Sequence, residues 1–461
     1  MESISFTSLE HPSKSLFWTA LVSEGSEMNT EDPLGLDYIA QQVGLILLPT
    51  LTTRSNRAQA FATVLYGLHI AGEACERYGL PRTDDSRRAL FERWERFWAL
   101  ATLEFRGGVI GRGDGDSMRG IRGAKNAWRP GEGRLPLDFP LISRQQELGN
   151  LGAYLVPLRR SGLVVDGGVK PTPAALDILD GYWDEPGENT HVRRYDEYTL
   201  TALDPGRSSI ERKAGNLTLG KVGQRSRLLS LIAARREPQQ RRLYAALLER
   251  ARDPSTLAVT EIVEQATRAG VAAPRDVLAG ALDGRFGSPS AALRDQLLTA
   301  RAFGDFMQAL LGAFDRSYDA LDRRGWVASR AQVIDAAIDG VTHAALQDAA
   351  RRLLDTPAIA EIRRLPMHGE PCLRLADELT RADRPTTLEL MLAYHARVQR
   401  DRRHAASWIR DEGGKLVLAV TSYSANPASP RFPSYKLDVL RTLLVDVGRL
   451  PFVDASAEVG P

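Results

Sequence analysis

The stretch from Leu141 to Trp183 constrains the fold more than any other part of the chain. It predicts a helix with one apolar stripe, because leucines recur at three- and four-residue steps: Leu148, Leu151, Leu155 and Leu158. Ser161 and Gly162 follow the stripe directly. Glycine reaches the left-handed conformation at little cost, so we expect the helix to end there.

A short β-hairpin is expected after this stop. Leu163–Val165 favours a strand, Asp166–Gly168 has the chemistry of a tight turn, and Val169-Lys170 returns as the second strand. Thr172 and Pro173 suit the cap and the first turn of a further helix. We expect that helix to bury Ala175, Leu176, Ile178 and Leu179. Helix, hairpin and helix in this order are typical of a winged helix-turn-helix.

In this module the helix before the hairpin often lies in the major groove of DNA. We expect its solvent face to carry Asn150, Ala153, Tyr154 and Arg160. Asparagine and arginine can pair bidentately with adenine and guanine edges, and Lys170 beside the hairpin turn can reach a phosphate. Winged helices also act as protein-docking modules, and this face is only mildly basic. Protein docking therefore stays open as an alternative to nucleic-acid contact.

The segment from Arg106 to Arg134 is dense in glycine and arginine. Its basic residues are Arg106, Arg112, Arg119, Arg122, Lys125, Arg129 and Arg134. The acidic residues that oppose them are Asp114, Asp116 and Glu132. Glycine lets consecutive backbone N–H groups turn toward one anion, so the segment can follow a nucleic-acid backbone. We assign such contacts to Arg112, Arg119, Arg122, Lys125 and Arg129. The alternative is a linker between two helical blocks.

A second cationic feature lies near the start of an expected helix. Thr52 or Thr53 is the predicted cap of this helix, and Arg54 and Arg57 would then lie in its first turn. Cations are unfavourable next to a helix N-terminus. An anion is therefore expected to compensate them. It is either a carboxylate of the protein, which is the commoner solution, or a phosphate of a ligand.

The whole sequence predicts a mainly α-helical protein with five consecutive parts. They are a helical domain with the Arg/Gly-rich loop (1–135), the winged helix (136–185), a basic linker (186–225), a helical scaffold (226–384) and a helix–hairpin–helix unit (385–461). In the last part Ser407–Arg410 and Lys415–Leu418 flank a glycine-containing turn. A second wing-like unit is therefore an alternative to a simple hairpin there.

Composition limits the partners and the compartment. The formal net charge of the 461 residues is +2, so nucleic-acid binding must depend on local basic patches. The sequence contains no apolar run long enough to cross a bilayer. Cys75 and Cys372 are far apart, which fits a reducing cytoplasm. Met367, His368 and Cys372 supply too few ligands for structural zinc. We expect a cytoplasmic protein with no metal, no cofactor and no membrane association.

Catalytic patterns are weaker than the winged-helix pattern. His395, Gln399 and Arg402 or Arg403 share one side of a helix that starts near Leu388. A histidine beside arginines can act as a general base, but no acidic or nucleophilic partner follows at a telling spacing. We therefore expect a protein that is not an enzyme. A nuclease or other hydrolase that uses His395 stays as an alternative.

Two segments resemble the beginnings and ends of uncharacterised bacterial proteins from anti-phage defence gene clusters. Residues 32–61 read DPLGLDYIAQQVGLILLPTLTTRSNRAQAF, and residues 394–420 read YHARVQRDRRHAASWIRDEGGKLVLAV. The resemblance assigns no functional residue. It implies a multi-protein system, which often includes an ATPase or a nuclease as a separate subunit.

The sequence thus favours a nucleic-acid-binding or adaptor subunit of a bacterial, defence-type complex. DNA and other protein subunits are the expected partners. The alternatives are a purely structural docking subunit without DNA contact, and the hydrolase that would use the His395 region.

Overall fold

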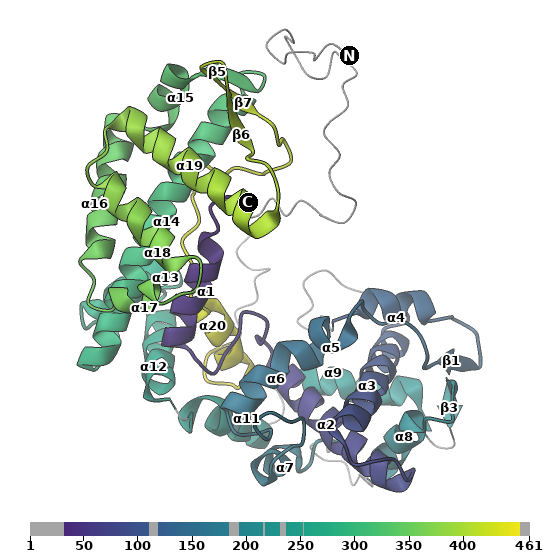
Figure 1. Cartoon of the computed structure of the whole chain (residues 1–461). Helices are drawn as coiled ribbons and strands as arrows, with labels where there is room; N and C mark the ends of the chain where they lie inside the picture. The colour runs from purple at the N-terminus through teal and green to yellow at the C-terminus, as the bar shows by residue number, and fades with distance from the viewer. Residues whose placement is uncertain are drawn as a thin grey trace, which may run out of the picture. The chain divides into compact units, whose positions relative to one another are not determined.

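A computed structural model of the chain describes residues 32–109, 119–183, 193–214, 217–230, 237–251 and 253–451. Most of these residues are helical, and the strands form small antiparallel sheets (Figure 1). The predicted mainly α-helical class is confirmed. No helix within these ranges is both long enough and apolar enough to span a bilayer.

The described chain divides into two compact units, and each unit is assembled from separate parts of the sequence. Unit 1 contains residues 32–47 and 272–435, and unit 2 contains residues 48–271 and 436–451. This division differs from the five consecutive parts expected from the sequence. The reason is that the chain returns to each unit after a long excursion, and composition along the sequence carries no signal of such a return.

Unit 1 is organised around α14 (Ala291–Asp322), a 32-residue helix with Phe303, Phe306 and Phe314 on its buried side. Four helices pack on α14: α1 (Leu36–Leu47), α13 (Pro274–Leu282), α15 (Arg330–Ala337) and α16 (Gly340–Leu354). Three more complete the unit: α17 (Ile359–Arg363), α18 (Gly369–Leu379) and α19 (Arg384–Arg403).

The sheet of unit 1 has three antiparallel strands. They are β5 (Val327–Ser329), β6 (Ile409–Glu412) and β7 (Lys415–Leu418), in the spatial order β5-β7-β6. Gly413 and Gly414 both have positive φ, as a tight two-residue turn between β6 and β7 requires. The hairpin predicted at the C-terminal part is confirmed, and its pairing with β5 was not predicted.

Unit 2 is built on two long helices, α2 (Ala58–Arg77) and α3 (Asp84–Phe105), which pack along each other. The aromatic stripe of α3 buries Trp94, Phe97 and Trp98. The remaining helices are α4 (Ile121–Ala127), α5 (Gln145–Leu148), α6 (Asn150–Arg160), α7 (Pro173–Leu179), α8 (Arg193–Leu203), α9 (Leu219–Ser230), α11 (Glu237–Tyr244), a π-helical turn (Ala245–Glu249), α12 (Pro254–Arg268) and α20 (Leu437–Asp446). Four short strands pair two by two: β1 (Arg134–Pro136) with β2 (Ser209–Glu211), and β3 (Lys213–Ala214) with β4 (Leu217–Thr218).

Helix α6, a hairpin and α7 follow one another in the predicted order. Gly162 has φ +74° and ends α6, and Gly167 has φ +73° in the turn. Two hydrogen bonds close the hairpin, from Val165 N to Lys170 O (3.0 Å) and from Thr172 N to Leu163 O (2.9 Å). The two arms share one isolated bridge, and among the described residues no third strand joins them. The structure therefore shows a helix–hairpin–helix here.

Candidate nucleic-acid interface

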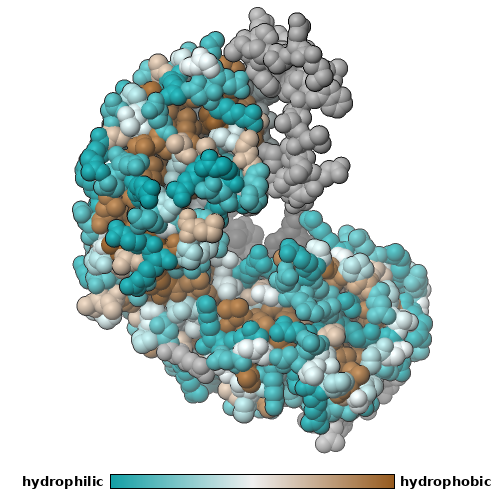
Figure 2. Space-filling model, viewed as in Figure 1, coloured by the Kyte–Doolittle hydropathy of each residue, from teal (hydrophilic) through white to brown (hydrophobic). Residues whose placement is uncertain are grey.

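Helix α4 lies in the Arg/Gly-rich segment and is amphipathic. Its apolar side packs with α3 and the chain after β1, through Ile121, Ala124, Trp128, Ala99, Leu103, Phe139 and Leu141. The opposite side is exposed and polar, and it carries Arg122, Lys125 and Asn126. Arg129 is also exposed, and it follows two residues after the helix ends at Ala127. The surface of unit 2 around α4 and α5 is mainly hydrophilic (Figure 2). Two of the predicted contact residues, Arg122 and Lys125, thus share one exposed face of α4.

Close backbone packing fixes α4 in place. A Cβ atom on Gly123 would lie 2.2 Å from Leu141 O and 2.6 Å from Pro140 O, so this position requires glycine. At the other end of the helix, the indole Nε1 of Trp128 donates to Glu104 Oε2 at 2.9 Å. Residues 121–128 form a packed helix and its cap, so the linker alternative does not describe this part of the segment. Arg112 lies outside the described residues.

A second group of cations lies where residues 48–57 run beside α6. Arg160, at the end of α6, donates to the carbonyl of Pro49. Further along, the Thr52 hydroxyl donates to Ala153 O at 3.3 Å. The loop therefore runs antiparallel to α6, from its last turn toward its first turn. Arg54 follows in this direction and is exposed.

Arg119 joins the loop to α4. Its guanidinium donates to Leu148 O, just before α6, at 3.3 Å. Burial and the positive charge of the nearby Arg54 both lower the pKa of Arg119. We define the basic surface as six residues: Arg54, Arg119, Arg122, Lys125, Arg129 and Arg160. Within the described residues no carboxylate forms an ion pair with any of them.

The buried side chain of Lys436 donates hydrogen bonds to the loop formed by residues 48–57. Lys436 is 3% exposed, and its Nζ donates to Leu48 O at 3.0 Å and to Leu51 O at 2.8 Å. Burial, with a smaller effect of Arg160, lowers the pKa of Lys436 to about 7. The first carbonyl groups of the loop are therefore engaged by this amine beneath the surface.

Two carboxylates lie beneath the basic surface rather than on it. Glu95 of α3 is 2% exposed and accepts hydrogen bonds from Asn150 N (2.7 Å) and Gln145 Nε2 (2.9 Å). Burial raises the pKa of Glu95 to about 7, although both hydrogen bonds lower it. Glu95 therefore accepts a hydrogen bond from the N-terminus of α6, and it makes no ion pair with the exposed cations.

The second of these carboxylates belongs to Asp446. It accepts a hydrogen bond from Ala58 N at 2.9 Å, and it pairs with Arg57 Nε at 3.1 Å. The predicted cap at Thr52 or Thr53 is wrong, because α2 begins at Ala58 and its first amide is satisfied from α20. The expectation that an anion offsets the cations at this helix start is confirmed for Arg57. The anion is a carboxylate of the protein.

The expected solvent face of α6 is wrong at three of its four positions. Asn150, Ala153 and Tyr154 are at most 8% exposed. The Tyr154 ring packs edge-on against Phe61 of α2, with 4.9 Å between ring centroids. The cause is that α2 and the loop cover this side of the helix. The exposed positions of α6 include Gly152, Val156 and Arg160.

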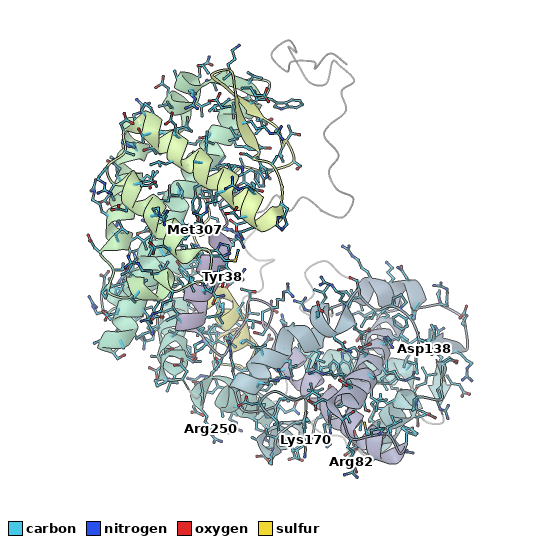
Figure 3. The ribbon with its side chains drawn as sticks, viewed as in Figure 1. Tyr38, Arg82, Asp138, Lys170, Arg250 and Met307 are labelled. Carbon is cyan, nitrogen blue, oxygen red and sulfur yellow. The ribbon has the colours of Figure 1, made fainter. Side chains whose placement is uncertain are left out.

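Lys170 is exposed at the surface of unit 2 but does not join α4 (Figure 3). The neighbouring Gly168 lies beside Asp84, the first residue of α3. Helix α4 instead packs near Ala99 and Leu103, toward the other end of α3. Fifteen or more residues of helix separate the two places, about 22 Å at 1.5 Å per residue. Leu176, expected to be buried near this hairpin, is 44% exposed.

His395 in unit 1 has a structural role. Its ring is fully buried, with Nδ1 2.7 Å from Pro33 O, and Nε2 accepts from Trp408 N at 3.0 Å. Gln399 donates to the same Pro33 carbonyl at 3.0 Å, and Arg402 pairs with Asp32 at 3.6 Å. This group holds the segment before α1 against α19. Both ring nitrogen atoms are engaged, so neither is left to accept a substrate proton.

No protein-family model, no curated protein and no solved structure matches the chain. The function is therefore inferred from the geometry of the two units and from the chemistry of their surfaces.

Proposed function

We propose that the protein binds nucleic acid through the basic surface of unit 2. The observation that carries this proposal is the absence of carboxylate partners for its six cations within the described residues. A polyanion supplies the missing counter-charge at regular intervals, and arginine matches the geometry of phosphate oxygens. Bringing Arg54 close to Arg119 is unfavourable in the free protein, and a bound phosphate would remove that penalty.

The cellular setting we propose is a cytoplasmic, bacterial, defence-type complex. In it this chain would be a nucleic-acid-binding or adaptor subunit, beside a separate ATPase or nuclease. The resemblance of residues 32–61 and 394–420 supports this setting. The buried and fully engaged ring of His395 favours a role without catalysis at that site.

Docking of another protein subunit is a second function, and one observation in unit 1 favours it. The order α14, β5, α15, then α19, β6, β7, with β5 beside β7, is typical of a winged helix with α16–α18 inserted. Arg330 at the start of α15 pairs with both Asp411 and Glu389. This pairing withdraws one positive charge of the module from phosphate contact and so favours a protein partner. The helix–hairpin–helix at 150–179 remains a weaker candidate for the same module.

Fluorescence anisotropy with a labelled DNA duplex tests the main proposal. The variant Arg122→Glu/Lys125→Glu should lower affinity by roughly tenfold or more, because it removes two cations from the face that approaches the nucleic acid and adds two repulsive charges. The dependence of log K on log salt should become shallower, by about 0.9 for each phosphate that the protein no longer neutralises.

The matched control is Arg82→Glu/Arg250→Glu, which makes the same charge change on exposed residues of unit 2. Arg82 precedes the first turn of α3 and Arg250 follows the π-helical turn, both away from α4 (Figure 3). This variant should bind nearly as the parent does. Equally weakened binding in both variants, or a parent without salt-dependent binding, would contradict the proposal.

A further inference from the structure

We infer that α4 enters the major groove of duplex DNA and that Asn126 and Arg122 determine sequence preference there. This inference rests on the proposed function and deepens it. It moves the base contacts from α6, where the sequence predicts them, to a helix of the Arg/Gly-rich segment.

The exposed face of α4 has one row of two polar side chains, with a lysine beside it. Arg122 and Asn126 are four residues apart, so they follow each other along the helix. Lys125 lies beside this row on the same exposed side, and Arg129 follows after the helix ends at Ala127. Arg122 and Asn126 can therefore face base edges while Lys125 faces the phosphates at the edge of the groove.

The chemistry of these side chains fits this division. An asparagine amide pairs bidentately with N6 and N7 of adenine, and an arginine guanidinium pairs with O6 and N7 of guanine. Among the described residues nothing hydrogen-bonds to the side chains of Asn126, Arg122 or Lys125. Arg129 donates to the backbone carbonyl of Trp128, which leaves its charge unneutralised. These donors and acceptors are thus available to a ligand.

The size and anchoring of α4 also suit a groove. An α-helix with its side chains is about 10–12 Å across, and the major groove is about 12 Å wide. The seven residues of α4 span about 10 Å along the helix axis. Gly123 and Trp128 fix the helix from the opposite side, so its orientation is set before DNA binds. By contrast, exposed Gly152 and Val156 of α6 offer no side-chain hydrogen bond to a base edge.

Selection from a pool of randomised duplexes, with the full-length protein, tests this inference. The parent should enrich a short motif that contains adenine and guanine. Asn126→Ala should relax the preference at one position by roughly 5- to 150-fold, the effect of one bidentate base contact. Its affinity for the unselected pool should stay unchanged.

Lys125→Ala is the matched variant beside the Arg122–Asn126 row. It should weaken binding to all sequences alike and reduce the salt slope by about 1, without changing the motif. Asn126→Gln keeps the amide and should alter the preference rather than abolish binding. Circular dichroism of each variant should match the parent, since these side chains are exposed.

The outcomes separate the inference from the proposed function. Salt-dependent binding without any enriched motif would overturn the inference and leave nucleic-acid binding intact. An unchanged motif in Asn126→Ala would do the same. Preference for single-stranded DNA, or for duplex RNA with its narrow major groove, would also overturn it. Absence of binding to every nucleic acid would defeat both.

Discussion

Arginines of unit 1 and of the basic surface in unit 2 differ in their partners. In unit 1 a carboxylate stands beside most exposed arginines, as in the pairs Arg275–Asp305, Arg323–Asp319, Arg352–Asp348, Arg364–Glu361 and Arg384–Asp335. On the basic surface, the described residues supply only backbone carbonyls, or nothing at all. The two regions have similar residue types, but the arginines are largely neutralised in unit 1 and keep their charge on the basic surface.

The difference lies in where the acids near the basic surface are placed, because elsewhere in unit 2 exposed arginines such as Arg77 and Arg134 also pair with carboxylates. In unit 1 many carboxylates are on the surface beside cations. Beneath the basic surface, Glu95 and Asp446 are buried and accept hydrogen bonds from the first amides of α6 and α2. A chain with a formal net charge of +2 can therefore present a local, uncompensated cationic patch. Average charge says little about binding when acids are used as helix caps.

Among the effects predicted here, the loss of stability on removing Asp446 should be the largest. Asp446→Ala leaves Arg57 and the first amide of α2 without an acceptor, so unit 2 should lose roughly 3 kcal/mol or more of unfolding free energy. Hydrogen exchange of peptides from α2, in increasing urea, reports this loss. The control is Asp319→Ala in unit 1, whose partner Arg323 is largely exposed. It should cost less than about 1 kcal/mol. Equal costs would show that the buried acid is not special.

The buried acid Glu95 gives a pH-dependent test. Its pKa in the folded protein is about 7, above the ordinary value of 4.5, so the folded state holds its proton more tightly. Its contribution to stability is complete below pH 4.5 and is lost as pH rises through 7. Glu95→Gln should remove this decline, which amounts to up to about 3 kcal/mol.

Unfolding free energies measured at several pH values between 5 and 8 check the Glu95 prediction. The control Glu147→Gln changes an exposed glutamate on α5 and should leave the shape of the parent curve intact. If the unfolding free energy of Glu95→Gln depends on pH in the same way as that of the parent, the raised pKa of Glu95 is contradicted.

The smallest expected effect on stability comes from the repulsion between Arg54 and Arg119. Arg54→Gln removes a like charge beside Arg119 and should stabilise the free protein by about 0.3 kcal/mol at low salt. Arg323→Gln in unit 1 removes a cation that has a carboxylate partner and should have the opposite sign. Thermal unfolding at low and high salt measures both. Since salt screens exposed charges, both effects should shrink as salt is added, and effects of the same sign would refute the contrast.

The sequence predicted the features that depend on neighbouring residues. The end of α6 at Gly162, the turn around Gly167 and the hairpin at Gly413-Gly414 follow from local backbone preferences, and the structure has all of them. It did not predict the pairing of β5 with β7, or that Asp446 serves α2. Those contacts join parts of the chain that are far apart, and no local pattern encodes them.

The residues of the candidate site were also predicted only in part, because their exposure depends on distant parts of the chain. Asn150 and Tyr154 are polar or amphipathic residues on a short helix, so their burial depends on which elements cover them. Helix α4 was missed because glycine is dense around it, and Gly123 is needed only where the distant Leu141 carbonyl approaches. The spacing of Ile121, Ala124 and Trp128 is a helical apolar pattern and was the available signal.

The split origin of unit 2 has a consequence for protein synthesis. Ala58 and Asp446 are 388 residues apart, so the ribosome needs roughly 20 to 80 s at 5–20 residues per second to supply this cap after α2 emerges. Until Asp446 has been synthesised, Arg57 at the start of α2 lacks this carboxylate partner. One cut in the chain between residues 57 and 446 would also separate the two halves of this contact. Nascent chains that end before residue 446 therefore lack the carboxylate that accepts from Ala58 N and pairs with Arg57 beneath the basic surface.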